Sequence, residues 1–265
     1  MPITPYMVNA TPPASTDSVF FEFPARAYLE KYYNHVGDEN AAFMRSITDY
    51  LRDRSVPTNT VIEVAGGPCL YSLMAMMSCR ERPFRHVTFT DIGWKNLREV
   101  EGWLHDYPQQ FDYQPLLSWL QDEVGADPER ISSSLRSSTW ELVNFDWREP
   151  VPTSWTRAHD IVSCHFFAES ATNDEAELVD FLRKLGRLGC PGATLLLSFM
   201  CKSDGYIIGQ REFPAFSIDE HNVFGYLEQA GLELEDVELS ITPCEDPSTM
   251  PGYDALLFIA GRWRR

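Results

Sequence analysis

The stretch that most restricts what this chain can fold into spans residues 61–71, VIEVAGGPCLY. It begins as an apolar strand, continues through a turn at Gly66 and Gly67, and ends where a helix begins. A second apolar segment then ends on Asp91, at the spacing where α/β folds place an acid that binds ribose hydroxyls. A plain strand, turn and helix with an incidental Gly-Gly-Pro would also explain the first segment. The two segments together predict a nucleotide-type pocket at the carboxyl ends of two neighbouring parallel strands.

The turn is poorly suited to a pyrophosphate. Phosphate-binding turns follow the pattern G-x-G-x-x-G and present free backbone N–H groups at the start of the helix. Here Pro68 removes one of those donors, Tyr71 occupies the place of the last glycine, and the turn contains no Lys or Arg. S-adenosylmethionine (SAM) carries a sulfonium cation, a ribose and an adenine but no phosphate. The sequence therefore predicts SAM as the cofactor, with NAD and ATP as weaker alternatives.

Composition narrows the class of partner further. The chain has 265 residues, 44% of them hydrophobic, which suffices for the core of one large α/β domain. A formal net charge of −17 disfavours nucleic acid and anionic membranes as partners, because both require basic patches. The six cysteines form no C-x-x-C pair, so we predict no metal site and free thiols. Without a signal-peptide pattern or an apolar run long enough for a bilayer, we expect a cytoplasmic protein, monomeric or a weak homodimer.

Strand and helix patterns alternate along most of the chain. Residues 1–18 are rich in Pro, Thr and Ser and are expected to be mobile, and residues 19–55 are expected to be largely helical. We predict capping boxes at residues 172–175 and 217–220, each beginning a helix, and a turn at residues 189–192. The predicted strands are 60–64, 86–90, 141–145, 159–166, 194–200, 233–240 and 255–260. The predicted helices are 25–33, 39–54, 71–79, 95–106, two short ones within 107–138, and those that follow the capping boxes as far as 188 and 231.

This order predicts a single α/β domain over residues 1–265. Strands that alternate with helices form a doubly wound, Rossmann-like parallel sheet. The last two strands have no helix between them, so we expect them to form a closing antiparallel hairpin. A seven-stranded sheet with an antiparallel last strand is the architecture usual for SAM-dependent methyltransferases.

Three side chains near the predicted strand ends can carry chemistry. Asp146 follows a strand and can accept a hydrogen bond from an adenine amino group, with Phe145 or Trp147 as a ring wall; an ordinary exposed aspartate is the alternative. Glu169 follows the fourth strand, where substrate and cofactor meet in such sheets, and is the best candidate for handling a proton or a cationic amine. His165 can act as a base, although a lone histidine at a strand end is more often a wall residue.

A set of short motifs resembles a known family. Residues 28–33 (YLEKYY) precede the sheet, where packing in the core would also explain their rings. With the motifs that follow, they resemble the small-molecule methyltransferases that include nicotinamide, phenylethanolamine and indolethylamine N-methyltransferases, from Phe23 to the end of the chain. The other motifs are GGP with Tyr71, TD at 90–91, NLRE at 96–99, WL at 103–104, LGCPG at 188–192, YIIG at 206–209 and STM at 248–250.

For the cofactor, the resemblance implies that residues 19–55 form an N-terminal helical lid whose two tyrosines close over SAM. It also places the glycine turn at the methionine end of SAM. It also implies that Asp91 binds the ribose. The cofactor-binding residues assigned in this way, with the two wall residues added, are Tyr28, Tyr33, Gly66, Gly67, Tyr71, Asp91, Asn96 near the adenosine, Asp146 on the adenine, Trp147 and His165.

For the acceptor, the resemblance implies that Glu169 and Asp254 contact a substrate amine, and we assign the catalytic role to Glu169. Tyr206 matches a tyrosine of the substrate pocket. Together with neighbouring aromatic rings it is expected to form a flat apolar slot that selects an aromatic ring. The residues assigned to acceptor binding are Phe166, Phe199, Ser203, Tyr206 and Asp254.

Three positions depart from the family pattern. Ala65 replaces the first glycine of the usual G-x-G. Phe199 occupies the position at which the nicotinamide enzymes have an acid that binds the carboxamide, and Ala215 occupies the position at which they have a serine. The pocket implied by the resemblance is therefore more apolar, and nicotinamide itself fits it poorly.

Together these observations predict a SAM-dependent methyltransferase that acts on a small aromatic or amine substrate, most plausibly at nitrogen. Methylation at carbon or oxygen of an indole or phenol is the first alternative, because the acceptor atom depends on the pose in the pocket. A non-catalytic SAM-binding protein is the second alternative, and a dehydrogenase is the weakest.

Overall fold

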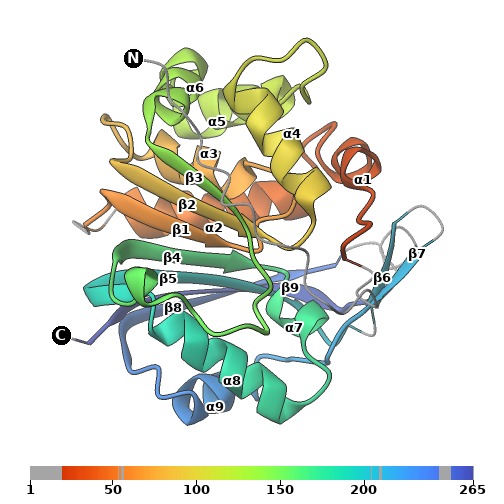
Figure 1. Cartoon of the computed structure of the whole chain (residues 1–265), viewed down its shortest axis with the longest axis vertical. Helices are drawn as coiled ribbons and strands as arrows, with labels where there is room; N and C mark the ends of the chain where they lie inside the picture. The colour runs from red at the N-terminus through yellow and green to blue at the C-terminus, as the bar shows by residue number, and fades with distance from the viewer. Residues whose placement is uncertain are drawn as a thin grey trace. The chain divides into compact units, whose positions relative to one another are not determined.

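The computed structural model describes residues 20–52, 54, 57–203, 205–208, 211–244 and 252–264. Of Tyr206, Arg211, Glu212 and Pro214 it describes the backbone alone. The chain forms two compact units, Met1–Asp146 and Trp147–Arg265, whose elements are drawn in Figure 1. The expected mobility of residues 1–18 and the STM motif at 248–250 lie outside the described residues.

The first unit contains three parallel strands in the order β3-β2-β1. Ile62 pairs with Thr88 and Phe89 pairs with Leu142, so the strands end along one edge. The inner residues of β1 and β2 are buried, as expected for parallel strands that are covered on both faces. This edge brings the glycine turn after β1 next to Asp91, as the sequence predicts. The bounds are Thr60–Val64 for β1, His86–Asp91 for β2 and Trp140–Asn144 for β3.

Helices surround these strands in the described part of the unit (Figure 1). α3 (Tyr71–Ser78) is buried along residues 71–77, which fits a helix that is apolar on all sides. α5 and α6 have a proline in their first turn, and Asp127 caps α6 by accepting a hydrogen bond from the Glu129 N–H at 3.0 Å. These are the two short helices predicted within residues 107–138. The helix bounds are Ala25–Tyr32 for α1, Asp38–Arg52 for α2, Trp94–Leu104 for α4, Gln114–Val124 for α5 and Pro128–Ser137 for α6.

The second unit contains four strands in the order β4-β5-β9-β8. β4 and β5 are parallel, with His165 paired to Ser198. β9 runs antiparallel to β5 on one side and to β8 on the other. The predicted closing hairpin is therefore confirmed, and the last strand of the chain is antiparallel to both neighbours. The bounds are His159–His165 for β4, Gly189–Cys201 for β5, Leu234–Pro243 for β8 and Ala255–Trp263 for β9.

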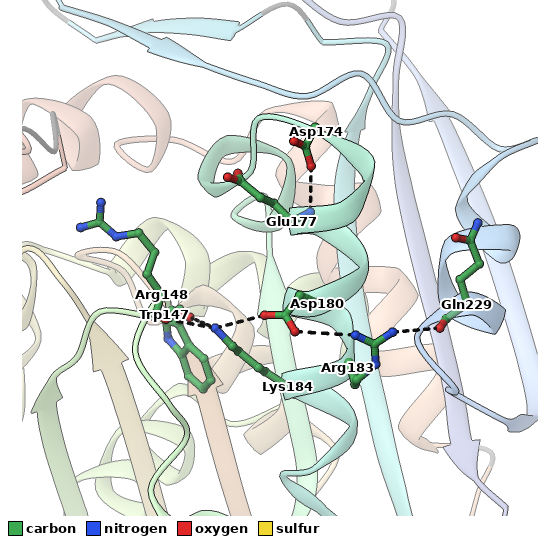
Figure 2. Close-up of polar contacts among 8 residues, drawn as sticks. All are labelled: Trp147, Arg148, Asp174, Glu177, Asp180, Arg183, Lys184 and Gln229. Atoms are coloured by element: carbon green, nitrogen blue, oxygen red, sulfur yellow. Dashed lines mark hydrogen bonds and ion pairs between the residues drawn. The ribbon is translucent and has the colours of Figure 1, made fainter.

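Helix α8 (Glu175–Gly186) organises the polar contacts of this unit (Figure 2). Lys184 Nζ donates to the carbonyl oxygens of Trp147 at 2.9 Å and Arg148 at 3.2 Å. Arg183 Nη2 donates to the carbonyl of Gln229 at the end of α9 (Val223–Gln229), at 3.3 Å. α8 thus holds both the start of the unit and α9 in place. The remaining short elements are α7 (Ala168–Ala171), a 3-10 turn at Thr153–Trp155, and the hairpin β6 (Gly205–Ile208) and β7 (Arg211–Pro214).

Both predicted capping boxes are displaced. Asp174, not Thr172, caps α8 by accepting the Glu177 N–H at 2.9 Å, and Glu177 reaches back to the Asn173 N–H at 2.9 Å (Figure 2). Thr172 instead donates its hydroxyl to the Ala168 carbonyl. The second prediction fails because Asp219 accepts the N–H groups of two following residues and closes a turn before α9 begins. At the first place an aspartate replaces a threonine at the cap, as its higher rank among N-cap residues predicts. At the second place the N-cap of α9 is Asn222, which makes no side-chain cap hydrogen bond.

Two further predictions need correction in the same region. Residues 189–192 belong to β5 and do not form a separate turn. The pairing of β4 with β5 shifts register there, and Gly192 takes a left-handed φ of 81°, so the LGCPG motif forms a bulge at the start of the strand. The hairpin of β6 and β7 was not predicted, because its sequence lacks an alternating apolar pattern.

The described residues contain no helix that is long and apolar enough to cross a bilayer. The six cysteines all lie in the described part of the chain, and none of them is joined to another in a disulfide.

Candidate functional site

The turn after β1 is held in place by the last two residues of β2. Thr90 accepts the Ala65 N–H on its hydroxyl at 3.1 Å and the Gly66 N–H on its carbonyl at 3.0 Å. A Cβ on Gly66 would lie 2.4 Å from the Phe89 ring, so this position requires glycine. Gly67 has a left-handed φ of 65°, and a Cβ there would meet no described atom within 4 Å. Gly66 therefore packs against the sheet, and Gly67 leaves the open backbone that a ligand can approach.

Asp91 lies beneath this turn and is 6% exposed. Its Oδ2 accepts the Gly67 N–H at 2.9 Å, and its Oδ1 accepts the Gly93 N–H at 2.7 Å and the Asn96 amide at 2.9 Å. Burial raises the pKa of this carboxyl to about 6, although the three hydrogen bonds oppose the rise. The Asn96 Oδ1 is buried and has no hydrogen-bond partner among the described residues. Asp91 and Asn96 thus present acceptor oxygens suited to the hydroxyls of a ribose.

Sequence reasoning missed three residues that build this arrangement. A Cβ on Gly93 would lie 2.9 Å from the Asn96 amide and 3.0 Å from Asp91 Oδ1, so only glycine fits between them. Asn144, at the end of β3, donates to the carbonyls of Asp91 at 3.1 Å and Ile92 at 2.7 Å. Tyr113 donates its hydroxyl to the Pro68 carbonyl at 3.0 Å. The spacing of glycine and asparagine after Asp91 was the one sequence signal that could have indicated Gly93.

Aromatic rings connect α1 to the start of α3. The Tyr33 ring lies 5.7 Å from Tyr28 and 5.0 Å from Tyr71, measured between centroids. Tyr33 and Tyr71 are buried, and burial raises the pKa of both phenols. Arg26 also binds Glu99 on α4 through two hydrogen bonds, at 3.1 and 2.6 Å. The segment that contains Tyr28 and Tyr33 therefore packs beside the glycine turn. This position fits both interpretations of the segment, a helix packed in the core and a lid over the cofactor.

We expect hydrogen exchange to separate these two possibilities. If residues 20–33 form a lid, amide exchange in this segment should slow when S-adenosylhomocysteine and an acceptor are added, because closure excludes water. Mass spectrometry of exchanged peptides measures this change, with peptides from α8 as the internal control. Equal exchange with and without ligands would show that Tyr28 and Tyr33 serve only as packing.

Two residues that follow β3, Asp146 and Trp147, are buried. Asp146 is 9% exposed, so an ordinary exposed aspartate is the wrong description. Trp147 is 5% exposed, and its ring packs against Phe181 of α8 at a centroid distance of 6.0 Å. Whether these residues touch an adenine stays a prediction.

His165, at the end of β4, is engaged on both sides of its ring. Nε2 lies 2.7 Å from the Ser163 hydroxyl, and Nδ1 lies 2.9 Å from the Ser198 hydroxyl. Burial lowers the pKa of the imidazole to about 3, so the ring is neutral and a weak base. Ser198 also accepts the Phe166 N–H on its carbonyl at 2.9 Å. The arrangement favours a wall or positioning residue over a general base.

Glu169, the predicted catalytic residue, begins α7 a few residues later and is fully buried. Its Oε1 accepts the Met200 N–H of β5 at 2.8 Å. Its Oε2 is buried and has no partner among the described residues. Burial raises the pKa of this carboxyl to about 7, so it exchanges a proton near neutral pH. A buried carboxylate with one open oxygen can hold a hydrogen-bonded amine and accept its proton.

The residues assigned to the acceptor occupy different settings. Phe199 is fully buried in β5, and Phe166 is half-buried with a left-handed φ of 54°. Ser203 is buried, and its hydroxyl bonds to the backbone of Gly205, accepting the N–H at 3.2 Å. The Asp254 carboxylate lies 3.4 Å from Lys202 Nζ. The side chain of Tyr206 lies outside the described part of the chain, so the flat aromatic slot stays a prediction.

The sequence comparisons agree with the resemblance. The profile of the NNMT/PNMT/TEMT family matches residues 12–263. Human nicotinamide N-methyltransferase is 26% identical, over 94% of this chain and 96% of its own length. Phenylethanolamine N-methyltransferase of Macaca mulatta is 25% identical, over 89% and 86% of the two chains. Indolethylamine N-methyltransferase of Oryctolagus cuniculus is 24% identical, over 90% and 92%.

The fold is also shared with solved structures. A SAM-dependent methyltransferase from Clostridium acetobutylicum superposes with a TM-score of 0.55, at 10% identity, over 91% of this chain and 98% of that one. The likeness extends over both compact units, and it shows the predicted Rossmann-like fold of SAM-dependent methyltransferases.

Proposed function

The chain belongs to the NNMT/PNMT/TEMT family, and from this premise we propose that it transfers a methyl group from SAM to a nitrogen of a small aromatic or amine substrate. The relatives named above act on nicotinamide or on arylalkylamines, which supports an acceptor of this class. The observation that carries the proposal is Glu169 Oε2, a buried oxygen without a hydrogen-bond partner among the described residues. An amine that is to be methylated needs a hydrogen-bond acceptor and a group that takes its proton.

The residues of the first unit fit the proposed cofactor. Gly67 offers open backbone, and Asp91 with Asn96 offers acceptor oxygens for two neighbouring hydroxyls. The open Asn96 Oδ1 supports a ligand in this place, because a buried acceptor without a partner costs stability. We assign Gly67 and Tyr71 to the methionine end, Asp91 and Asn96 to the ribose, and Asp146 to the adenine. SAM would supply the electrophilic methyl group.

In the second unit, Glu169 would orient the acceptor and manage its proton. An amine attacks only in its unprotonated form, so the ammonium proton must leave first. Glu169 Oε2 accepts that proton, directly or through water, and this assistance is typically worth about 10²- to 10⁴-fold in rate. Holding the nitrogen in line with the methyl group can contribute roughly 7–11 kcal/mol more. His165 and Ser198 keep the end of β4 in place and are positioning residues in this scheme.

An untargeted assay tests the function without assuming a substrate. The protein is incubated with a cell metabolite extract and SAM that carries an isotopically labelled methyl group. Mass spectrometry should then reveal one or a few small aromatic amines that have gained the label. Binding of SAM without any labelled product would support a non-catalytic SAM-binding protein instead.

A further inference from the structure

In the described part of the chain, three residues other than glycine adopt a left-handed φ directly after a strand. They are Ala65 after β1 (51°), Phe166 after β4 (54°) and Lys202 after β5 (55°). This conformation is unfavourable for residues with a Cβ and concentrates at ligand sites. Ala65 and Phe166 already lie in segments assigned to the cofactor and the acceptor. Lys202 has the same placement, at the strand end where open α/β sheets bind ligands, and has no role so far.

The backbone around Lys202 is firmly held. Its N–H donates to the Ile218 carbonyl at 2.7 Å, and the neighbouring Cys201 carbonyl accepts the Asp254 N–H at 2.9 Å. Lys202 also comes two residues after Met200, whose N–H binds the carboxylate of Glu169. The lysine therefore starts from a fixed point near the residue proposed to bind the acceptor amine.

The side chain of Lys202 changes the charge of the acceptor region. Its Nζ lies 3.4 Å from Asp254 Oδ2, and the two side chains are 49% and 68% exposed. The hydrogen bond to Asp254, followed by the negative charge of that carboxylate, raises the pKa of Lys202, so the lysine is an ammonium at neutral pH. Asp254 thus already has a cationic partner, and a simple cationic amine would have to compete with Lys202 for it. An ion pair this exposed stabilises the fold little and rearranges easily.

Resting on the methyl-transfer function proposed above, we propose that Lys202 binds a carboxylate of the acceptor, so that the preferred acceptors are aromatic amino acids rather than the corresponding simple arylalkylamines. The amine of such an acceptor would bind the open oxygen of Glu169 and its carboxylate would bind Lys202.

Matched pairs of acceptors that differ only in the carboxylate test this proposal. Tryptophan and tryptamine, tyrosine and tyramine, and phenylalanine and phenylethylamine are compared by transfer of a labelled methyl group from SAM. The wild type should prefer the carboxylated member of at least one pair by 10-fold or more in kcat/KM, as expected for a charge-assisted hydrogen bond. Lys202→Met keeps the apolar stem without the charge, and should reduce this ratio about 10-fold or more, chiefly through KM.

A control separates a local contact from a general loss of positive charge. Arg264→Met removes another exposed cation of the same unit, one that pairs with Glu233 at 3.3 Å, and should leave the ratio unchanged. A wild-type preference for the decarboxylated amines, or the same ratio in Lys202→Met as in the wild type, would overturn the proposal.

A binding measurement keeps this test independent of methyl transfer. Indole-3-propionate carries a ring and a carboxylate but no amine. Calorimetry with S-adenosylhomocysteine present should show that it binds the wild type about 10-fold more tightly than Lys202→Met. Equal binding would refute the carboxylate site even if amines are methylated. Tighter binding to the wild type, with no turnover of any pair and no labelled product from the metabolite extract, would retain the site and refute the methyl-transfer function.

Discussion

Replacing Glu169 by Gln should lower the turnover of an amine acceptor by about 10²-fold or more while SAM affinity stays nearly unchanged. The substitution keeps the shape of the side chain and its acceptor for the Met200 N–H, but removes the oxygen that takes the proton. Turnover and KM are measured with the acceptor found in the labelling assay, and SAM affinity is measured by calorimetry.

The pH dependence should identify the same group. The pKa of Glu169 is raised to about 7 by burial, so kcat/KM of the wild type should rise with pH through this value as the carboxylate forms. The Gln variant should lose this step and keep only the one that belongs to the amine. Glu177→Gln is the control, because Glu177 also accepts a backbone N–H, at 2.9 Å, but is exposed.

Stability measurements show whether the variant is folded and test the same pKa. A carboxyl whose folded pKa lies above its unfolded value stabilises the fold fully below about 4.5, and this stabilisation is lost as the pH rises through about 7. The stability of Glu169→Gln relative to the wild type should therefore increase by about 3 kcal/mol between pH 4 and pH 9. Thermal unfolding at the two pH values measures the difference.

The kinetic pattern decides between roles for this residue. A rise in KM alone would mean that Glu169 only binds the acceptor, equally in the ground and transition states. If neither parameter moves, the role implied by the amine-methylating relatives is wrong at this position. Methylation at carbon or oxygen then becomes the favoured reaction.

Replacing Asp91 by Ala should weaken SAM binding by about 1–3 kcal/mol, because hydroxyls and N–H groups that bind the carboxylate lose their acceptor. The Gly67 and Gly93 N–H groups and the Asn96 amide are all held by this one side chain, so the turn itself would also loosen. Calorimetric titration with SAM and with S-adenosylhomocysteine measures the change, and NAD should not bind to either protein.

The control for Asp91 is an aspartate with a similar local role. Asp219 accepts the N–H groups of His221 and Asn222, both at 2.9 Å, and is not part of the proposed cofactor site. Asp219→Ala should lose some stability and bind SAM as the wild type does. Unchanged SAM affinity in a folded Asp91→Ala variant would remove Asp91 from the site.

The features that the sequence alone predicts correctly are those encoded by residues close together in the chain. The strand, turn and helix around Gly66 and the acid at the end of the next strand follow from local apolar patterns and from glycine's tolerance of a left-handed backbone. The order of elements also predicts the antiparallel last strand, since two strands without a helix between them pair as a hairpin. The cap predictions were wrong because Asp174 and not Thr172 caps α8, and because Asp219 closes a turn before α9, which has no side-chain cap.

Tertiary structure alone decided the environment of each candidate side chain. The sequence shows Glu169 only as a carboxylate that follows a strand. In the structure, the N–H of Met200 in β5, 31 positions away, binds one of its oxygens and leaves the other without a partner, and full burial raises its pKa. The Lys202–Asp254 pair and the contact of Asn144 with Asp91 join residues that the sequence keeps far apart. Local patterns determine which element forms, whereas burial and pairing depend on which distant segments fold against each other, and these set the charge and hydrogen-bonding capacity of the site.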